Sequence, residues 1–561
     1  MRWVVLLVAV FLPVTVGLSL IAEQPVPGRR GDAATTPEPP AVEAPAEAPA
    51  AKADLPLPAK GEPAPRAEKL PVADDAAAKA LRADLAKILS DAGLTKTVTT
   101  ARVVSVPEKG GAGGGRVLLD VQADEPVIPA STMKLLTTAA CLDRLGFAWQ
   151  IRTTLGRLPA AAKGAPADLV VVGGGDPNFS GRFYDGDVTG AFRKWAEALK
   201  HRGVAAVGGL VLDDTLFDNS YIHPNWPANQ REEWYEAPVG ALDLADNCVE
   251  VHVAPAAKAG DPAKVWLVPE TPYAAVSGTI ATVAEKGAKF SLNRELLPAA
   301  EGACGPLMNI VAIGKISAKA FEGCEFRAVG DPTMYFGLTL ADTLRKEGIA
   351  VAGPVTRRRV CDKDGNLPQE FVCDIVHTSR LDSSATVANK HSQGMYAECL
   401  SKLLGAYGPT PKCESPLPPR QGSWKTGTEE VVRWLSDVGI NAEGCILEDG
   451  SGLSKQNRLT AACVADVLRV MYERHGPAFM ETLSVAARDG SLRNRMKGTS
   501  AEGNVFGKTG YVYGVSALSG YVKTKSGGIL AYSIIMNGFP AGELWKARAA
   551  QDKACVRMAE Y

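Results

Sequence analysis

The sequence predicts an α/β (α+β) domain of helices and strands that is interrupted by a large, mainly β insertion. Three observations predict this class. An amphipathic helix and two β-rich runs come first, short β-type runs separated by Gly, Pro and Asp turns follow, and helical patterns then return before a closing hairpin and helix. At 561 residues the chain is also too long for one compact core. We divide it into a signal peptide or signal-anchor (1–23), a Pro/Ala-rich linker (24–72), a first part of the domain (73–165), the insertion (166–371) and a second part of the domain (372–561).

The N-terminal segment is predicted to direct export. Arg2 precedes a long apolar run, and Pro13 and Gly17 within it weaken a stable membrane span, so cleavage is favoured over retention as an anchor. The run has no cysteine near its end, which argues against a lipoprotein anchor. The following Pro/Ala-rich stretch cannot bury enough surface to fold, and we interpret it as an extended tether. The location predicted for the rest of the chain is the periplasm or cell envelope.

The net charge, the cysteines and the histidines argue against several kinds of ligand. The net charge of −1 gives no electrostatic reason to expect binding to nucleic acid or to an anionic membrane surface. Eleven cysteines suit an oxidising compartment, and the closest pairs predict the disulfides Cys304/Cys324 and Cys361/Cys373, with at least one thiol left over. The sequence contains no C-x-x-C, and its six histidines are scattered without metal-ligand spacing, so no zinc site is expected.

Helical and β-type patterns alternate along the chain. Residues 75–94 have apolar positions at helical spacing and a Gly stop. The runs "TARVVSV" and "RVLLDVQ" are strands, and the glycine run between them is a hairpin loop, because a strand and not a helix follows it. Pro177 and the absence of a following helix likewise exclude a dinucleotide site at "LVVVGGGDPNFSG". After residue 372, helices are predicted at "QGMYAECLSKLLGAYG", "TEEVVRWLSDVGI", "TAACVADVLRVMYERHG" and the C-terminus, and a hairpin at "VSALSGYVKTKSGGILAYSIIMNG".

The segment "PASTMKLLTTAACLDRLG" holds the first candidate for chemistry. Met133 and Leu136 belong to a buried helical stripe, and Ser131 and Lys134 are separated by three residues, so they share a face one turn apart. Desolvation would lower the pKa of Lys134 and let it accept the hydroxyl proton, which is a Ser-Lys form of nucleophile activation. Taken alone, the pattern also fits a helix cap followed by an exposed lysine.

Lys-Thr-Gly occurs twice, and the two copies have different surroundings. The copy at 425–427 leads into an acidic first turn and an amphipathic helix, with Thr428 as a cap, so it is interpreted as a helix entry. The copy formed by Lys508, Thr509 and Gly510 begins a β-rich run. A strand edge offers backbone N–H groups, a positive charge and a hydroxyl to a carboxylate-bearing substrate, and glycine lets that substrate approach the backbone. The second copy is therefore the functional candidate.

A third motif stands between these two. In "NKHSQGMYAE", Ser392 precedes a predicted helix. Ser-x-x-Lys, a downstream serine motif and a late Lys-Thr-Gly form the signature of penicillin-binding proteins and serine β-lactamases. The chain resembles the class C low-molecular-weight penicillin-binding proteins, the D-alanyl-D-alanine carboxypeptidases/endopeptidases of the penicillin-binding protein 4 type. The resemblance runs from about residue 75 to 550 and includes "ASTMKLLTTAACLDRLG", "GGGDP", "WYEAPVGALDLADNCVEVHVAP", "DGSGLSKQNRLTA", "ARDGSLRNRM" and "GKTGYVYGVSALSGYV".

The resemblance implies a fold and a reaction. The fold is an antiparallel sheet packed with helices, as in penicillin-binding proteins and serine β-lactamases. Ser131 would attack the D-Ala–D-Ala carbonyl or a peptide cross-link to give an acyl-enzyme, Lys134 would be the base, and Ser392 would relay a proton to the leaving amine. The implied partners are peptidoglycan stem peptides, with β-lactams as covalent inhibitors of the same serine. Neither a metal nor an organic cofactor is implied.

The resemblance also assigns the substrate-binding residues. Lys508 and Thr509 would hold the terminal carboxylate of the substrate, next to Gly510. The oxyanion hole would consist of the backbone N–H groups of Ser131 and Tyr511.

Two positions depart from the family pattern. The family has Ser-x-Asn at the second motif, whereas this chain has Ser392, Gln393 and Gly394, so the amide that binds the substrate is missing. A water, Gln393 or Asn389 is a candidate to replace it. Tyr511 stands where Thr or Ser usually follows Lys-Thr-Gly. The leading hypothesis is an active D,D-peptidase, and the alternatives are an impaired or non-catalytic peptidoglycan-binding protein and a hydrolase of another amide or ester.

Overall fold

The computed structural model describes most of the chain after residue 69. The described residues are 42–43, 70–107, 115–159, 164–298, 305–409, 418, 420–540 and 542–561, and all of them belong to one compact unit, Thr35–Tyr561. The predicted export segment, most of the linker and Cys304 lie outside them. None of the described helices is long and apolar enough to cross a membrane.

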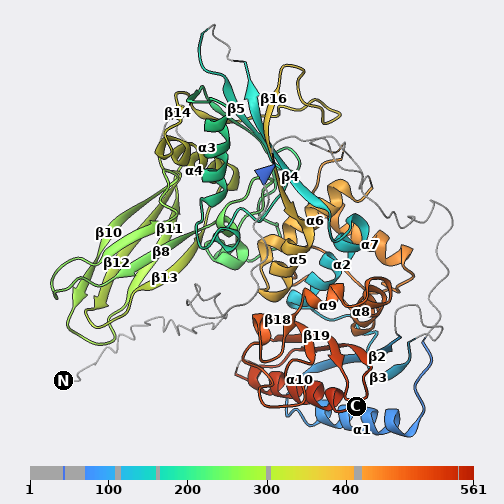
Figure 1. Cartoon of the computed structure of the whole chain (residues 1–561). Helices are drawn as coiled ribbons and strands as arrows, with labels where there is room; N and C mark the ends of the chain where they lie inside the picture. Colours follow the sequence, from blue (N-terminus) through green and yellow to red (C-terminus); the bar gives the residue numbers. More distant parts are fainter. Residues whose placement is uncertain are drawn as a thin grey trace, which may run out of the picture. The chain divides into compact units, whose positions relative to one another are not determined.

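A six-stranded antiparallel sheet combines two strands from residues 98–121 with four strands from residues 484–537 (Figure 1). Its order is β17-β18-β19-β20-β2-β3, so the two strands predicted near the N-terminus lie beside the C-terminal hairpin. The bounds are β2 Val98–Val106, β3 Val117–Val121, β17 Ser484–Val485, β18 Val505–Val512, β19 Val515–Lys523 and β20 Ile529–Asn537.

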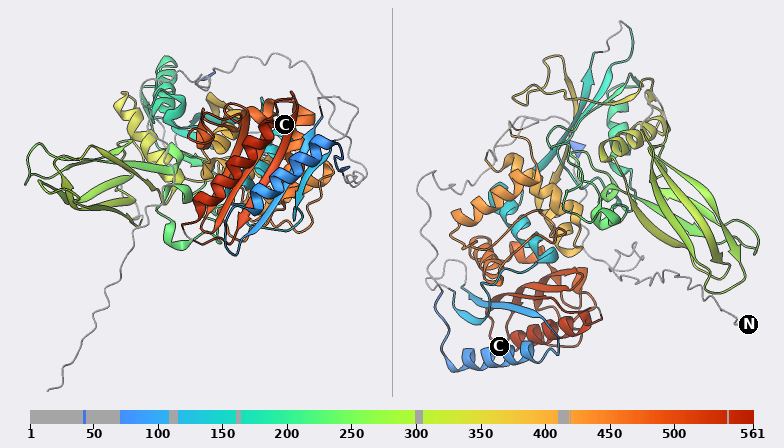
Figure 2. Two further views of the ribbon diagram at one scale, coloured as in Figure 1. Left: turned by 90° about the horizontal axis from the view of Figure 1, so that it is seen from below. Right: turned by 180° about the vertical axis from the view of Figure 1, so that it is seen from behind.

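Helices cover both faces of this sheet. Helices α1 (Ala76–Ser90) and α10 (Leu544–Ala559) lie side by side on one face (Figure 2) and share an ion pair between Asp84 and Arg557. Val103 of β2 belongs to their core, whereas the next residue, Val104, belongs to the larger core that contains α8. Successive side chains of a strand point to opposite faces, so β2 takes part in both cores.

The larger core is built around α2, which contacts four other helices. Every residue of α6 is buried, including its charged ones, so each of these needs a polar partner. The helix bounds are α2 Met133–Leu145, α5 Leu381–Lys390, α6 Gly394–Tyr407, α7 Trp424–Asp437, α8 Ala461–His475 and α9 Ala478–Glu481.

The inserted part contains a second six-stranded sheet, of order β1-β16-β4-β5-β7-β15, and two helices. Strands β1, β4 and β16 lie outside the predicted range 166–371, and β1 lies in the predicted linker, where no strand was expected. Strand β16 pairs with β1 and β4, and β4 pairs with β5 inside that range. The domain boundaries therefore stay a prediction, and this shared sheet favours an insertion that begins near β4 and ends near β16. The bounds are β1 Val42–Glu43, β4 Gln150–Leu158, β5 Asp168–Val172, β7 Leu210–Asp213, β15 Val355–Arg357, β16 Val372–Arg380, α3 Gly190–His201 and α4 Pro332–Lys346.

Three smaller sheets complete the described insertion. Their orders are β13-β8-β9, β10-β12-β11 and β14-β6. Strand β8 is central in the first of them, with β13 and β9 antiparallel on its two sides. The bounds are β6 Ala206–Val207, β8 Cys248–Ala254, β9 Lys264–Val268, β10 Ala274–Val283, β11 Phe290–Leu296, β12 Met308–Ser317, β13 Gly323–Ala328 and β14 Ala350–Val351.

The predicted disulfide Cys361/Cys373 is wrong, because both thiols are free. The Cys361 N–H donates to Asp213 Oδ2 at the end of β7, whereas Cys373 lies on β16, three strands away in the same sheet. Three strand spacings amount to about 14 Å, and a disulfide requires Cα atoms within about 7 Å. For the other predicted pair, Cys324 carries a free thiol and Cys304 lies outside the described residues.

Candidate active site

Ser131 and Lys134 meet at the start of α2. Ser131 lies in the 3-10 turn Ala130–Thr132, which continues directly into the helix. The Lys134 ammonium donates to Ser131 Oγ at 3.1 Å and to the backbone oxygen of Ser451 at 2.8 Å. The second bond fixes the end of the lysine side chain beside the serine.

Burial shifts the protonation equilibrium of Lys134 towards its neutral form. Burial lowers the pKa of Lys134 to about 8, and the carboxylates of Glu398 and Asp449 offset part of this effect. A lysine that loses its proton near neutral pH can act as a base, and an exposed lysine cannot. Lys134 is 2% exposed, so the alternative of a helix cap followed by an exposed lysine is wrong.

Ser392 and Lys508 form a second serine-lysine pair. Ser392 lies between α5 and α6 in the left-handed backbone region, with φ +56°, a conformation that costs a non-glycine residue free energy. The Lys508 ammonium donates to Ser392 Oγ at 2.8 Å and to the backbone oxygen of Thr509 at 2.8 Å. Burial lowers the pKa of Lys508 well below its usual range, and the nearby charge of Lys134 lowers it further. The two pairs therefore belong to one electrostatic environment.

Strand β18 carries the remaining predicted residues past the nucleophile. Thr509 Oγ1 donates to Ser491 Oγ at 2.9 Å, and Tyr511 is 37% exposed. A Cβ at Gly510 would lie 2.8 Å from the backbone oxygen of Pro129 and 3.1 Å from the nitrogen of Ser131. Glycine is thus required at position 510 because the turn that carries Ser131 packs against this strand. From the sequence, the approach of the substrate was instead the expected reason for this glycine.

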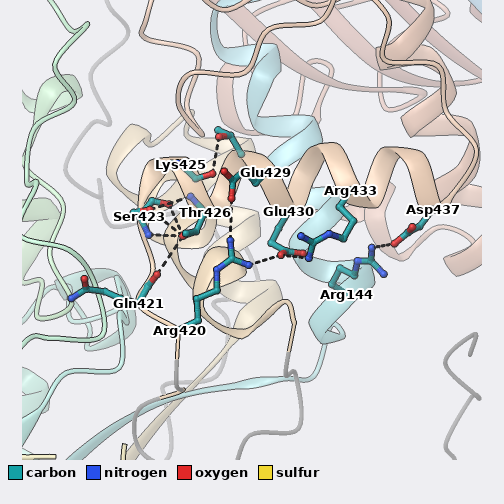
Figure 3. Close-up of polar contacts among 11 residues, drawn as sticks. Arg144, Arg420, Gln421, Ser423, Lys425, Thr426, Glu429, Glu430, Arg433 and Asp437 are labelled. Atoms are coloured by element: carbon teal, nitrogen blue, oxygen red, sulfur yellow. Dashed lines mark hydrogen bonds and ion pairs between the residues drawn. The ribbon is translucent and has the colours of Figure 1, made fainter. Parts of the chain in front are cut away.

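The other Lys-Thr-Gly copy lies at the N-terminus of α7 (Figure 3). Ser423 Oγ accepts from the backbone N–H of Thr426 at 3.0 Å, and Thr426 Oγ1 accepts from the backbone N–H of Ser423 at 2.9 Å. This reciprocal pair is a capping box. Thr428 was predicted as the cap, but it lies inside the helix, where its hydroxyl donates to the backbone oxygen of Trp424. Lys425 is exposed, so this copy is a helix entry.

Comparison with known proteins decides the family. Residues 81–560 match the D-Ala-D-Ala carboxypeptidase 3 (S13) family. The chain belongs to this family. A D-alanyl-D-alanine carboxypeptidase of Actinomadura sp. is 33% identical over 500 residues, which are 86% of this chain and 85% of that protein. The D-alanyl-D-alanine carboxypeptidase DacB of Haemophilus influenzae is 23% identical over 444 residues, covering 76% of this chain and 84% of the relative.

Solved structures agree on the fold. The crystal structure of penicillin-binding protein 4 (dacB) from Haemophilus influenzae has a TM-score of 0.65 with this chain at 21% identity, and it covers 84% of this chain and 99% of its own. A second structure of that protein, complexed with a β-lactam, has a TM-score of 0.62. The predicted fold class and the resemblance to the penicillin-binding protein 4 type are confirmed.

The departure from the family pattern at Gly394 has a structural counterpart. Gly394 is the first residue of α6, and a Cβ built on it would lie 3.2 Å from the backbone oxygen of Tyr235. This contact is tight, so the 3-10 turn Trp234–Glu236 would have to shift by a few tenths of an ångström to admit a side chain at this position. Glycine at position 394 allows this turn to approach the start of α6 closely.

Neither side chain suggested as a replacement is free to take the place of the missing amide. The side-chain amide of Asn389 donates to Thr138 and Thr482. Gln393 Nε2 donates to Asp246 Oδ2 at 2.7 Å, which leaves Gln393 Oε1 as its unpaired polar atom. That oxygen accepts hydrogen bonds, whereas the missing asparagine would also donate one.

Sequence reasoning did not assign a role to Glu398, which supports Lys134. Its carboxylate accepts from the backbone N–H groups of Gly450 and Ser451, both at 2.8 Å, and from the Trp424 indole at 2.9 Å. Burial and the nearby charge of Asp449 raise the pKa of Glu398 to about 7, although its hydrogen bonds offset part of this effect. The loop that it holds offers the Ser451 oxygen to Lys134. The quoted segments "MYAE" and "DGSGLS" contained these residues, but only as marks of the resemblance.

Proposed function

We propose that this chain is a serine D,D-peptidase that cleaves D-Ala–D-Ala stem peptides or peptide cross-links of peptidoglycan through an acyl-enzyme on Ser131. The observation that carries the proposal is that two buried lysines, Lys134 and Lys508, each bond to a partly exposed serine and lie close enough to affect each other's charge. Lys134 Nζ lies 3.1 Å from Ser131 Oγ, and Lys508 Nζ lies 2.8 Å from Ser392 Oγ. A protein that only binds peptidoglycan has no chemical need for both pairs.

The acylation step follows from these contacts. Neutral Lys134 takes the proton of the Ser131 hydroxyl as Oγ bonds to the carbonyl carbon of the substrate. The resulting oxyanion accepts hydrogen bonds from the backbone N–H groups of Ser131 and Tyr511. Ser392 passes a proton to the departing amine, the C–N bond breaks, and water later hydrolyses the ester to release Ser131.

The substrate carboxylate binds beside Lys508 and Thr509. The hydrogen-bond partners of Lys508, Ser392 Oγ and the Thr509 carbonyl, are uncharged. An arriving carboxylate supplies the missing negative charge and favours the protonated form of Lys508. Binding of the correct substrate therefore restores a charge that burial disfavours in the free enzyme.

Peptidoglycan lies outside the cytoplasm, so the proposed substrate places the protein there as well. Residues 1–23 are proposed to direct export, and membrane attachment through them belongs to this proposal.

Labelling with a fluorescent penicillin tests the activity. We expect a covalent adduct on Ser131 that the Ser131→Ala variant does not form. Ser423→Ala is the matched control, because Ser423 caps helix α7 and has no role in the proposed reaction. Absence of the adduct in a folded protein would support the non-catalytic binding alternative. If the adduct forms, release of D-Ala from a pentapeptide and cleavage of cross-linked muropeptides separate carboxypeptidase from endopeptidase activity.

Two variants at Gly394 measure the effect of the missing amide. Gly394→Ala adds only the Cβ that approaches Tyr235, and Gly394→Asn adds the amide as well. We expect the Asn variant to be acylated by penicillin no faster than the Ala variant, because the tight contact with the Tyr235 oxygen constrains any side chain at this position. An Asn variant faster than both the Ala variant and the wild type would show that the site admits the amide and that its absence limits the rate.

A further inference from the structure

A cluster of metal-binding side chains lies on the sheet β13-β8-β9 of the insertion. Glu250 and His252 are two residues apart on β8, so they point to the same face. Cys324 on β13 is the direct cross-strand partner of His252. The intervening Val251 is buried on the other face of the sheet.

The ligand atoms are close enough for one ion. His252 Nε2 lies 3.1 Å from Glu250 Oε2, and Cys324 Sγ lies 3.9 Å from the same oxygen. The three ligand atoms all lie within 4.8 Å of one another. Zinc bonds of about 2.0–2.3 Å in a tetrahedron separate neighbouring ligand atoms by roughly 3.3–3.8 Å. The cluster needs only small side-chain adjustments to reach this geometry.

A fourth residue holds the imidazole from its other side. Glu322 Oε1 lies 2.9 Å from His252 Nδ1. A carboxylate on one ring nitrogen keeps the proton there and leaves the other nitrogen free to bind a metal, as in many zinc sites. Trp266 of β9 stacks on the same ring, with centroids 5.0 Å apart and an interplanar angle of 18°. The ring is therefore oriented before any ion arrives.

We propose that Cys324 Sγ, His252 Nε2 and Glu250 Oε2 bind a zinc ion, with Glu322 orienting the histidine. Thiolate, imidazole and carboxylate together are a zinc-type donor set, and magnesium or calcium would select oxygen ligands alone. Binding releases the thiol proton to solvent, and a water molecule takes the fourth position. The ion would cross-link β8 to β13. The scattered histidines had argued against zinc, but the pairing of these strands brings together residues that are 72 positions apart in the sequence (252 and 324).

Metal binding by the full exported chain tests this site. The chelator-treated protein is titrated with Zn²⁺ against a chromophoric competitor, and separately with Co²⁺, whose bond to a thiolate gives a charge-transfer absorption band. We expect one zinc per chain, and both the zinc and the cobalt band lost in Cys324→Ser. Cys373→Ser, another half-buried cysteine on a strand, is the matched control and should bind as the wild type does.

Two further variants test the roles of His252 and Glu322 in zinc binding. His252→Gln should abolish binding, and Glu322→Gln should weaken it by about 10–100-fold, as expected for a residue that orients a ligand. His201→Gln, which alters an exposed histidine paired with Glu197, should leave binding unchanged. Each variant is accepted only if penicillin still labels it as it labels the wild type.

Three outcomes would overturn the zinc site. The first is wild-type protein that binds no zinc, and the second is a Cys324→Ser variant that binds zinc as tightly as the wild type. The third is peptide mapping of the exported protein that finds Cys324 joined to Cys304 in a disulfide, because an oxidised sulfur cannot supply the thiolate.

Discussion

The two Lys-Thr-Gly copies show how the same three residues acquire different roles. In the first copy Lys425 is exposed, and Thr426 closes a capping box with Ser423 (Figure 3). In the second copy Lys508 is fully buried, and its ammonium bonds to Ser392. The first copy is satisfied by its own helix, whereas the second is satisfied by a segment 116 residues away. Only in the second copy does burial disfavour the charge of the lysine, which is typical of functional sites.

Replacing each lysine should give the largest contrast. Lys508→Met removes the ammonium beside Ser392, and we expect penicillin acylation to slow by about 10²–10³-fold, as for other lost electrostatic contacts to the reacting group. Lys425→Met should acylate at the wild-type rate, because its ammonium is exposed. Stopped-flow acylation measures both rates. Equal losses in the two variants would remove the distinction between the copies.

The pH dependence of the acylation rate should follow the titration of the buried Lys134 and should not depend on the exposed Lys425. Lys134 must be neutral to accept a proton, and burial lowers its pKa to about 8, so the rate should rise with pH and level off above that value. Between pH 7 and pH 9 the neutral fraction increases about tenfold. Lys425→Met should show the same profile. A midpoint near the usual lysine value would contradict a desolvated Lys134.

The threonines should give the smallest and most selective effects. Thr426→Val breaks the capping box and should lower the free energy of unfolding by about 1 kcal/mol without changing acylation. Thr509→Val removes the hydroxyl that donates to Ser491, and it should slow cleavage of a carboxylate-bearing substrate about fivefold, the kinetic equivalent of a typical hydrogen bond. Urea denaturation and D-Ala release measure the two quantities. A loss of stability in Thr509→Val similar to that in Thr426→Val would give both hydroxyls a structural role.

Local patterns were sufficient where neighbours in sequence are neighbours in space. The helices around α2, the strands of the main sheet and the proximity of Ser131 to Lys134 follow from periodicity and from one helical turn. Quoted motifs then identified the family, and with it the fold class. The same reasoning placed the first Lys-Thr-Gly copy at a helix start and the second in a β-rich run, and the two copies lie in α7 and β18.

Tertiary structure decided the contacts between distant segments. Cys361 and Cys373 are close in sequence, yet Cys361 lies in a loop at the end of β7 and Cys373 lies on β16, three strands away, whereas His252 and Cys324 are far apart in sequence and directly paired. Glu398 supports Lys134 only because α6 packs against the loop that carries Ser451.

The sequence by itself determined the family, the main elements and the Ser131–Lys134 pair, because these depend on order and short-range geometry. Only the tertiary structure decided that Lys508 meets Ser392, that the Tyr235 oxygen lies close to Gly394, and that Glu250, His252 and Cys324 come together in the insertion. These contacts depend on strand register and helix packing, which are set by burial over the whole chain and not by any one motif.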